Sequence, residues 1–127
     1  MAYWLILINI VQLQIDQCQG ALQINQKKYD VWVISNTTEA HIKSLQTQFL
    51  FLNSFNGIIT SERAGAHKPH PKIFQFALEE ANTDVASSLF IDDSYTNIRS
   101  AENLGIVSHH YTRFDELVKF LEKNQKI

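Results

Sequence analysis

The chain has 127 residues, of which 45% are hydrophobic and 19% are charged, and its formal net charge is −2. This length allows one domain with a single core and is too short for two. The sequence lacks the clustered basic face of a nucleic-acid-binding protein, so we expect no nucleic-acid partner. The single cysteine, Cys18, excludes an internal disulfide and fits a reducing compartment, which predicts a cytoplasmic protein.

The first 28 residues differ in composition from the rest of the chain. Tyr3–Val11 is almost continuously apolar, yet it is much shorter than the ~20 residues that a membrane-spanning helix needs. It also lacks the basic leader and cleavage site of a signal peptide, so we expect no membrane contact and assign it to the fold. In the glutamine-rich stretch that follows, Gln12–Gln26, scattered leucines and isoleucines favour a helix or loop packed on the domain.

From Tyr29 onward, short apolar runs alternate with amphipathic segments. The apolar runs predict four strands, at Asp30–Ile34, Gly57–Thr60, Ser88–Ile91 and Ile106–Ser108. The amphipathic segments predict four helices, from Thr38 to about Gln48, Pro71 to about Ala81, Ser94 to about Leu104, and Phe114–Leu121. Between them, Phe49–Phe55 is an aromatic-rich connection and Ser61–His70 a loop.

Strands that alternate with helices in this way predict a parallel sheet with helices on both faces. In such folds, ligands bind at the carboxyl ends of the strands. There, Ser35 and Asn36 offer an anion site at a helix start, and Lys68 lies in a loop before a helix. Asp92 and Asp93 are adjacent carboxylates after a buried strand, and such hard oxygen ligands suit Mg²⁺. Taken singly, these features are also common helix caps or solvated surface groups.

Three segments carry a more specific resemblance. Val31–Thr37 resembles the second motif of haloacid-dehalogenase-type (HAD) hydrolases, and Lys68–Phe74 resembles the third. Leu89–Ser94, with Asn97 and Ala101–Gly105 after it, resembles the fourth. The resemblance is greatest to the subfamily of small-molecule phosphatases, dehalogenases and epoxide-hydrolase phosphatase domains. It implies an α/β, HAD-like (Rossmann-like) three-layer sandwich with a mostly parallel central sheet, here without the family's cap domain.

The resemblance also implies roles. Ser35 and Asn36 would bind the phosphate of a small phosphorylated molecule, and Lys68 would be the catalytic lysine that stabilises the phosphoryl group. Asp93, with Asp92 in a less definite role, would hold Mg²⁺. Asn97 would support these metal ligands by a hydrogen bond.

The family's first motif, Asp-x-Asp-x-Thr after the first strand, is not evident in this sequence. Its first aspartate attacks phosphorus, so no aspartyl intermediate forms without that carboxylate. Before Ser35 the acidic residues are Asp16, which has Cys18 where a second aspartate should stand, and Asp30, which precedes a strand.

The first strand of the family lies at the centre of the sheet, which leaves two explanations. Either that strand is missing and Tyr3–Val11 packs as a helix, or Trp4–Ile8 is the central strand. We favour the second, because it gives the neighbouring strands their hydrogen-bonding partner. Asn9 would then stand at the nucleophile position and Val11 at the acid/base position, and the glutamine-rich Gln12–Lys28 would replace the cap.

Three hypotheses about function remain open. The chain is a catalytically impaired HAD hydrolase, or an active hydrolase of which this sequence is only a part, or a non-catalytic interaction module. The third would use Phe49–Phe55 as a homodimer surface, although core packing is its ordinary explanation. His67, His70, His109 and His110 lack the spacing of a known metal site, and the first two are expected to face solvent.

Overall fold

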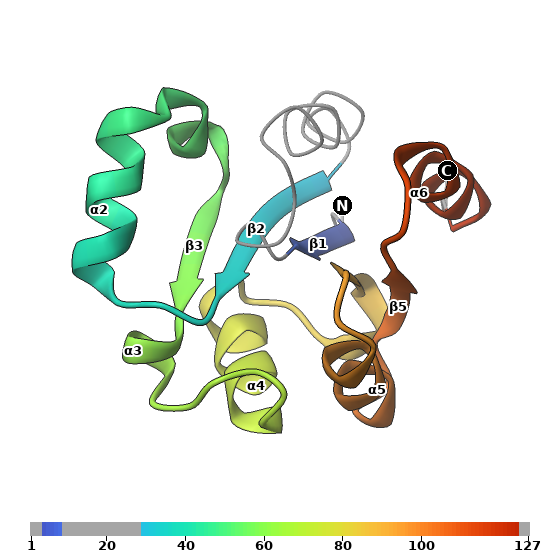
Figure 1. Ribbon diagram of the computed structural model, residues 1–127. Helices are drawn as coiled ribbons and strands as arrows, with labels where there is room; N and C mark the ends of the chain where they lie inside the picture. The colour runs from blue at the N-terminus through green and yellow to red at the C-terminus, as the bar shows by residue number, and fades with distance from the viewer. Residues whose placement is uncertain (1–3, 9–28, 125–127) are drawn as a thin grey trace.

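The computed structural model describes residues 4–8 and 29–124, which form five strands and the helices around them (Figure 1). The strands are β1 (Trp4–Ile8), β2 (Tyr29–Ser35), β3 (Gly57–Thr60), β4 (Ser88–Asp92) and β5 (Val107–His110). The α-helices are α2 (Glu39–Gln48), α3 (Ser61–Ala64), α4 (Pro71–Glu80), α5 (Tyr95–Asn103) and α6 (Phe114–Lys123). Two short 3-10 helices, η1 (Leu50–Ser54) and η2 (Val85–Ser87), precede β3 and β4. In these described ranges, no helix has the length and hydrophobicity to cross a bilayer.

The strands form one parallel sheet in the order β3-β2-β1-β4-β5. In the centre, Ile8 pairs with Val33 of β2 on one side and with Ile91 of β4 on the other. The prediction that Trp4–Ile8 is the central strand is therefore confirmed, and a packing helix at these residues is wrong. Asn9 and the glutamine-rich stretch lie outside the described residues.

Alternating side chains of the strands build a core on each face of the sheet. On one face, Val33 and Ile91 belong to a cluster that includes Leu117 and Leu121 of α6. On the other face, Ile34 and Phe90 pack with side chains of α3, α4 and α5. This second cluster contains the four buried residues of α4, namely Ile73, Phe74, Ala77 and Leu78.

Of the differences from the predicted boundaries, two lie close to the strand ends that were predicted to bind ligands. Ser61–His70 was expected to be a loop, but its first four residues form α3, because Thr60 accepts a hydrogen bond from the Arg63 amide and Gly65 ends the turn with φ 75°. The last strand begins at Val107 and continues to His110, so the predicted strand at Ile106–Ser108 stops too early.

The aromatic-rich connection between α2 and β3 packs mainly into the core. Leu52 and Phe55 are buried, and Phe49 and Phe51 pack against them. Leu50 differs, since 73% of its surface is exposed. Core packing, the ordinary explanation of this segment, therefore holds for four of the five apolar side chains, and the homodimer stays a prediction.

Candidate functional site

A buried ion pair joins the carboxyl end of β4 to the loop before α4. The Lys68 ammonium donates hydrogen bonds to the Asp92 Oδ2 atom at 3.2 Å and to the backbone carbonyl of Ile34 at 3.0 Å. The two charged side chains are only 1% and 0% exposed. Burial of two charges costs free energy unless each is paired and hydrogen-bonded, and both conditions are met here.

Asn36 fixes the backbone of Lys68 through two hydrogen bonds. Its Nδ2 atom donates to the Lys68 carbonyl at 3.2 Å, and its Oδ1 atom accepts from the Lys68 amide at 2.7 Å. The loop after β2 and the lysine loop, which are 32 residues apart in sequence, are thus held side by side. The structure brings these two predicted site segments together.

Three groups in the described part of the chain donate hydrogen bonds to the Asp92 carboxylate. Besides Lys68, Asn97 Nδ2 donates to its Oδ2 atom at 3.0 Å, and the Ser94 amide donates to its Oδ1 atom at 2.8 Å. Both Asp92 and Asn97 are buried. Asn97 therefore lies where a supporting hydrogen bond was predicted, and it orients Asp92 rather than Asp93.

Two buried oxygens of the predicted site lack hydrogen-bond partners within the described residues. They are the Ser35 hydroxyl, at the end of β2, and the Oδ1 atom of Asp93, directly after β4. A buried polar atom without a partner costs about 1–3 kcal/mol, so proteins seldom keep one without a reason. A bound phosphate would accept a hydrogen bond from the Ser35 hydroxyl, and a bound cation would supply the counter-charge for the Asp93 carboxylate.

The electrostatics of the site also favour a cation. Burial raises the pKa of Asp93 above its ordinary value, and the hydrogen bond and negative charge of Asp92 raise it further. Burial lowers the pKa of Lys68, while the charges of Asp92 and Asp93 oppose that change. Two carboxylates next to one buried ammonium leave negative charge that a divalent cation would offset.

The donor set fits Mg²⁺ better than a transition metal. Within residues 4–8 and 29–124, no group of three or more His, Cys, Asp or Glu side chains could hold a metal ion. Mg²⁺ needs no such cage, because it commonly binds one or two carboxylates and takes its other ligands from water and phosphate oxygens. Asp93 is the better ligand, since the Asp92 oxygens already accept hydrogen bonds from Lys68, Asn97 and Ser94.

The sequence did not predict two aromatic neighbours of this site. His110 Nε2 lies 2.9 Å from the Asp93 carbonyl, and the ring of Tyr95 lies 5.9 Å from the ring of His110. Strand register brings His110 there, because it pairs with Asp92, and a strand predicted to stop at Ser108 could not place it. His67 and His70 are exposed, as predicted.

Comparison with known proteins agrees with this geometry. Residues 14–110 match the family model described as "Haloacid dehalogenase-like hydrolase". A sesquiterpene phosphatase from Aspergillus oryzae is 27% identical over 97 residues, which are 76% of this chain and 48% of the relative. A D-ribitol-5-phosphate phosphatase from Bacteroides thetaiotaomicron is 29% identical over 109 residues, which are 80% of this chain and 51% of the relative. The chain thus spans about half the length of each of these two relatives.

One solved structure shares both the fold and the ligand chemistry that the site suggests. It is a HAD family enzyme from Bacteroides thetaiotaomicron in complex with magnesium and inorganic phosphate. Its TM-score is 0.69 at 27% sequence identity, with 80% of this chain and 56% of that chain covered.

Proposed function

Since this chain belongs to the haloacid dehalogenase-like hydrolase family, we propose that it is a phosphatase-type core that binds a small phosphorylated molecule with Mg²⁺. We further propose that Asn9 takes the place of the nucleophilic aspartate, so that hydrolysis is impaired. The proposed architecture is a three-layer sandwich in which the short stretch Gln12–Lys28 replaces the cap.

The observation that carries this proposal is the pair of unpartnered buried oxygens, Ser35 Oγ and Asp93 Oδ1, beside the Lys68–Asp92 ion pair. The Ser35 hydroxyl and the Asn36 loop would bind phosphate oxygens. The Lys68 ammonium donates hydrogen bonds to the Ile34 carbonyl and to Asp92, and from this position it would stabilise the phosphoryl group.

Asp93 would hold Mg²⁺, with Asp92 nearby. A bound Mg²⁺ supplies positive charge that offsets the phosphate oxygens and the two carboxylates. Asn97 positions Asp92, which in turn fixes the Lys68 ammonium. In this arrangement the protein groups orient and neutralise the phosphate whether or not a nucleophile is present.

The missing nucleophile is a proposal from sequence. Asn9 directly follows β1, where the family places its aspartate. A carboxamide has the shape of a carboxylate but carries no charge and is a poor nucleophile, so no aspartyl-phosphate would form. Val11, two residues later, cannot donate or accept the proton that the leaving group needs.

A variant of the Bacteroides enzyme supports ligand binding without the full set of carboxylates. That enzyme was also solved as a mutant with one aspartate replaced by alanine, and the mutant is likewise in complex with magnesium and inorganic phosphate. A HAD family enzyme can therefore hold both ligands after losing a carboxylate, which is the state we propose for this chain.

Two measurements on the purified protein test the proposal. Calorimetric titration with inorganic phosphate in the presence of Mg²⁺ should show binding that Asp93→Asn weakens about tenfold or more, consistent with loss of a charged ligand. Asp30→Asn is the control, because it makes the same chemical change near the start of β2, away from the carboxyl ends of the strands where the site lies, and it should bind like the wild type. If no phosphate binds, the binding part of the proposal is wrong.

Hydrolysis of p-nitrophenyl phosphate with Mg²⁺ tests the impairment. We expect no turnover by the wild-type protein above the background rate. The double variant Asn9→Asp, Val11→Asp restores the carboxylates of the first motif and should give measurable turnover. Clear wild-type hydrolysis that disappears in Asp93→Asn would overturn the impairment and leave an active phosphatase.

A further inference from the structure

A recess of about 400 Å³ opens between the start of α2 and the loop after α3. Thr37 and Thr38 line one side of it, and residues between Ser61 and His67 line the other. None of these side chains belongs to the phosphate and metal site described above.

The recess adjoins the proposed phosphate site. Thr37 directly follows Asn36, and His67 directly precedes Lys68. Asn36 and Lys68 are joined by two hydrogen bonds of 3.2 and 2.7 Å, so the two segments that carry the walls of the recess are held together where they continue into the proposed phosphate site. A molecule whose phosphate lay at Ser35 and Lys68 would therefore have this space beside it for its organic portion.

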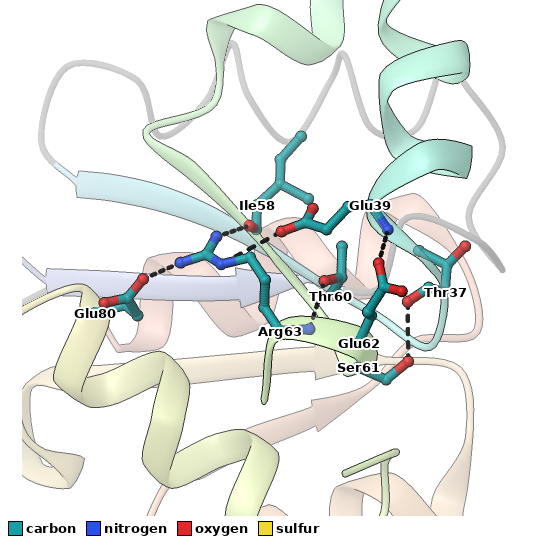
Figure 2. Close-up of polar contacts among 8 residues, drawn as sticks. All are labelled: Thr37, Glu39, Ile58, Thr60, Ser61, Glu62, Arg63 and Glu80. Atoms are coloured by element: carbon teal, nitrogen blue, oxygen red, sulfur yellow. Dashed lines mark hydrogen bonds and ion pairs between the residues drawn. The ribbon is translucent and has the colours of Figure 1, made fainter. Parts of the chain in front are cut away.

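Hydrogen bonds hold the two walls of the recess in place (Figure 2). The Ser61 hydroxyl donates to the Thr37 carbonyl at 3.0 Å, and the Glu62 amide donates to the same carbonyl at 3.3 Å. The Glu62 carboxylate accepts from the Glu39 amide at 2.8 Å, at the first turn of α2. The recess is thus a preformed space, as small-molecule sites usually are.

The lining favours a group that is polar and uncharged. Gly65 and Ala66 contribute little bulk, and the threonines offer hydroxyls and methyl groups. Among the residues that line the recess, Glu62 is the acidic one, and its negative charge disfavours a second anionic group on the ligand. A cation, the Lys72 ammonium, lies near Gly65.

We propose that this recess binds the organic portion of the phosphorylated molecule and selects an uncharged, hydroxyl-bearing chain over one with a carboxylate or a second phosphate. This inference rests on the proposed function, because the phosphate itself is assigned to Ser35, Asn36 and Lys68. Glu62 is its specificity-determining residue, since it is the acidic residue among those that line the recess.

Calorimetric titration with three probes in the presence of Mg²⁺ tests the selectivity. The probes are inorganic phosphate, glycerol 3-phosphate and 3-phosphoglycerate, of which the last two share a carbon chain length and differ by a carboxylate. The wild-type protein should bind glycerol 3-phosphate more tightly than inorganic phosphate and about tenfold more tightly than 3-phosphoglycerate, as one nearby like charge predicts.

Two variants test the residues. Glu62→Gln keeps an oxygen for the Glu39 amide but removes the charge, so the preference for glycerol 3-phosphate over 3-phosphoglycerate should fall to about twofold or less. Ala66→Leu fills the recess and should reduce the ratio of ester to inorganic phosphate affinity. Glu79→Gln, on the exposed side of α4, is the matched control and should keep the wild-type ratios.

The outcomes separate the two proposals. If the wild-type protein binds none of the probes, the proposed function is wrong and this inference is wrong with it. If it binds inorganic phosphate but the ratios in the wild type, Glu62→Gln and Ala66→Leu are equal, the recess is not a subsite and only this inference is overturned.

Discussion

Two clusters in this molecule each pair a cationic side chain with carboxylates, but their surroundings differ. Lys68 and Asp92 pair with side-chain exposures of 1% and 0% at the carboxyl ends of the strands. Arg63, which contacts Glu39 and Glu80 at the surface, has a side chain that is 37% exposed, and those of its partners are 37% and 39% exposed (Figure 2). The first cluster had to be fully desolvated on folding, whereas the second remains partly in water.

The difference indicates what each cluster is for. A buried ion pair rarely adds stability over apolar side chains of the same size, because removing two charges from water costs several kcal/mol per ion. The Lys68–Asp92 pair is therefore better explained by ligand binding than by stability. Arg63 ties the start of α2, Ile58 near the start of β3, and the end of α4 together on the surface, where each ion pair contributes roughly 0–1 kcal/mol.

The largest expected effect comes from removing one partner of the buried pair. Asp92→Ala leaves the Lys68 ammonium buried without its counter-charge, which should lower the free energy of unfolding by about 3–5 kcal/mol. Urea unfolding monitored by circular dichroism measures this value. The double variant Lys68→Met, Asp92→Leu should recover most of the lost stability while abolishing phosphate binding, and a double variant as unstable as Asp92→Ala would contradict our explanation of the pair.

Arg63→Ala should have a smaller effect, about 0.5–1 kcal/mol, because its partners remain solvated after the change. Part of this loss is packing, since the guanidinium lies 5.5 Å from the centre of the Phe76 ring. The same unfolding experiment at low and high salt separates the two clusters. The effect of Arg63→Ala should shrink at high salt and that of Asp92→Ala should not, and equal salt sensitivity would contradict the comparison.

His109 lies between the two extremes, and we expect it to have the smallest effect. Its ring stacks on Phe120 of α6 at 4.8 Å, and burial lowers its pKa below the ordinary value of 6.5, against the opposing charge of Glu116. The folded state therefore binds the proton less well than the unfolded state, so stability is full above about pH 6.5 and falls as the pH drops towards the folded-state pKa. Between about pH 7 and pH 5, a range that includes the ordinary histidine pKa of 6.5, unfolding curves for His109→Phe should show a smaller loss of stability than those of the wild type. An equal loss of stability in the two proteins would contradict the assignment of this pH dependence to His109.

Much of the fold follows from the sequence, because its signals are local. The apolar run Trp4–Ile8 has the character of a strand buried on both faces, and it lies at the centre of the sheet. Thr38 begins a helix as predicted, and its hydroxyl accepts a hydrogen bond from the His41 amide. The short helix α3 was missed, since four residues between two caps give too little periodicity to recognise.

The site was less predictable than the fold, because its details depend on contacts between distant segments. The motifs identified Lys68 and Asp92, but neither the Ile34 carbonyl that accepts from Lys68 nor the satisfied state of Asp92 can be seen in a sequence. The same holds for the recess, whose walls are 24 residues apart at the Ser61–Thr37 contact.

The central position of β1 has a consequence for synthesis. Of the five described strands, β1 is made before the others, and it can pair with β2 soon after that strand is made. Its other neighbour is β4, which ends at Asp92, so a nascent chain that stops short of that residue exposes one edge of β1. The second edge of β1 and the buried Lys68–Asp92 pair are therefore completed together, and until then chaperones have an apolar strand edge to recognise.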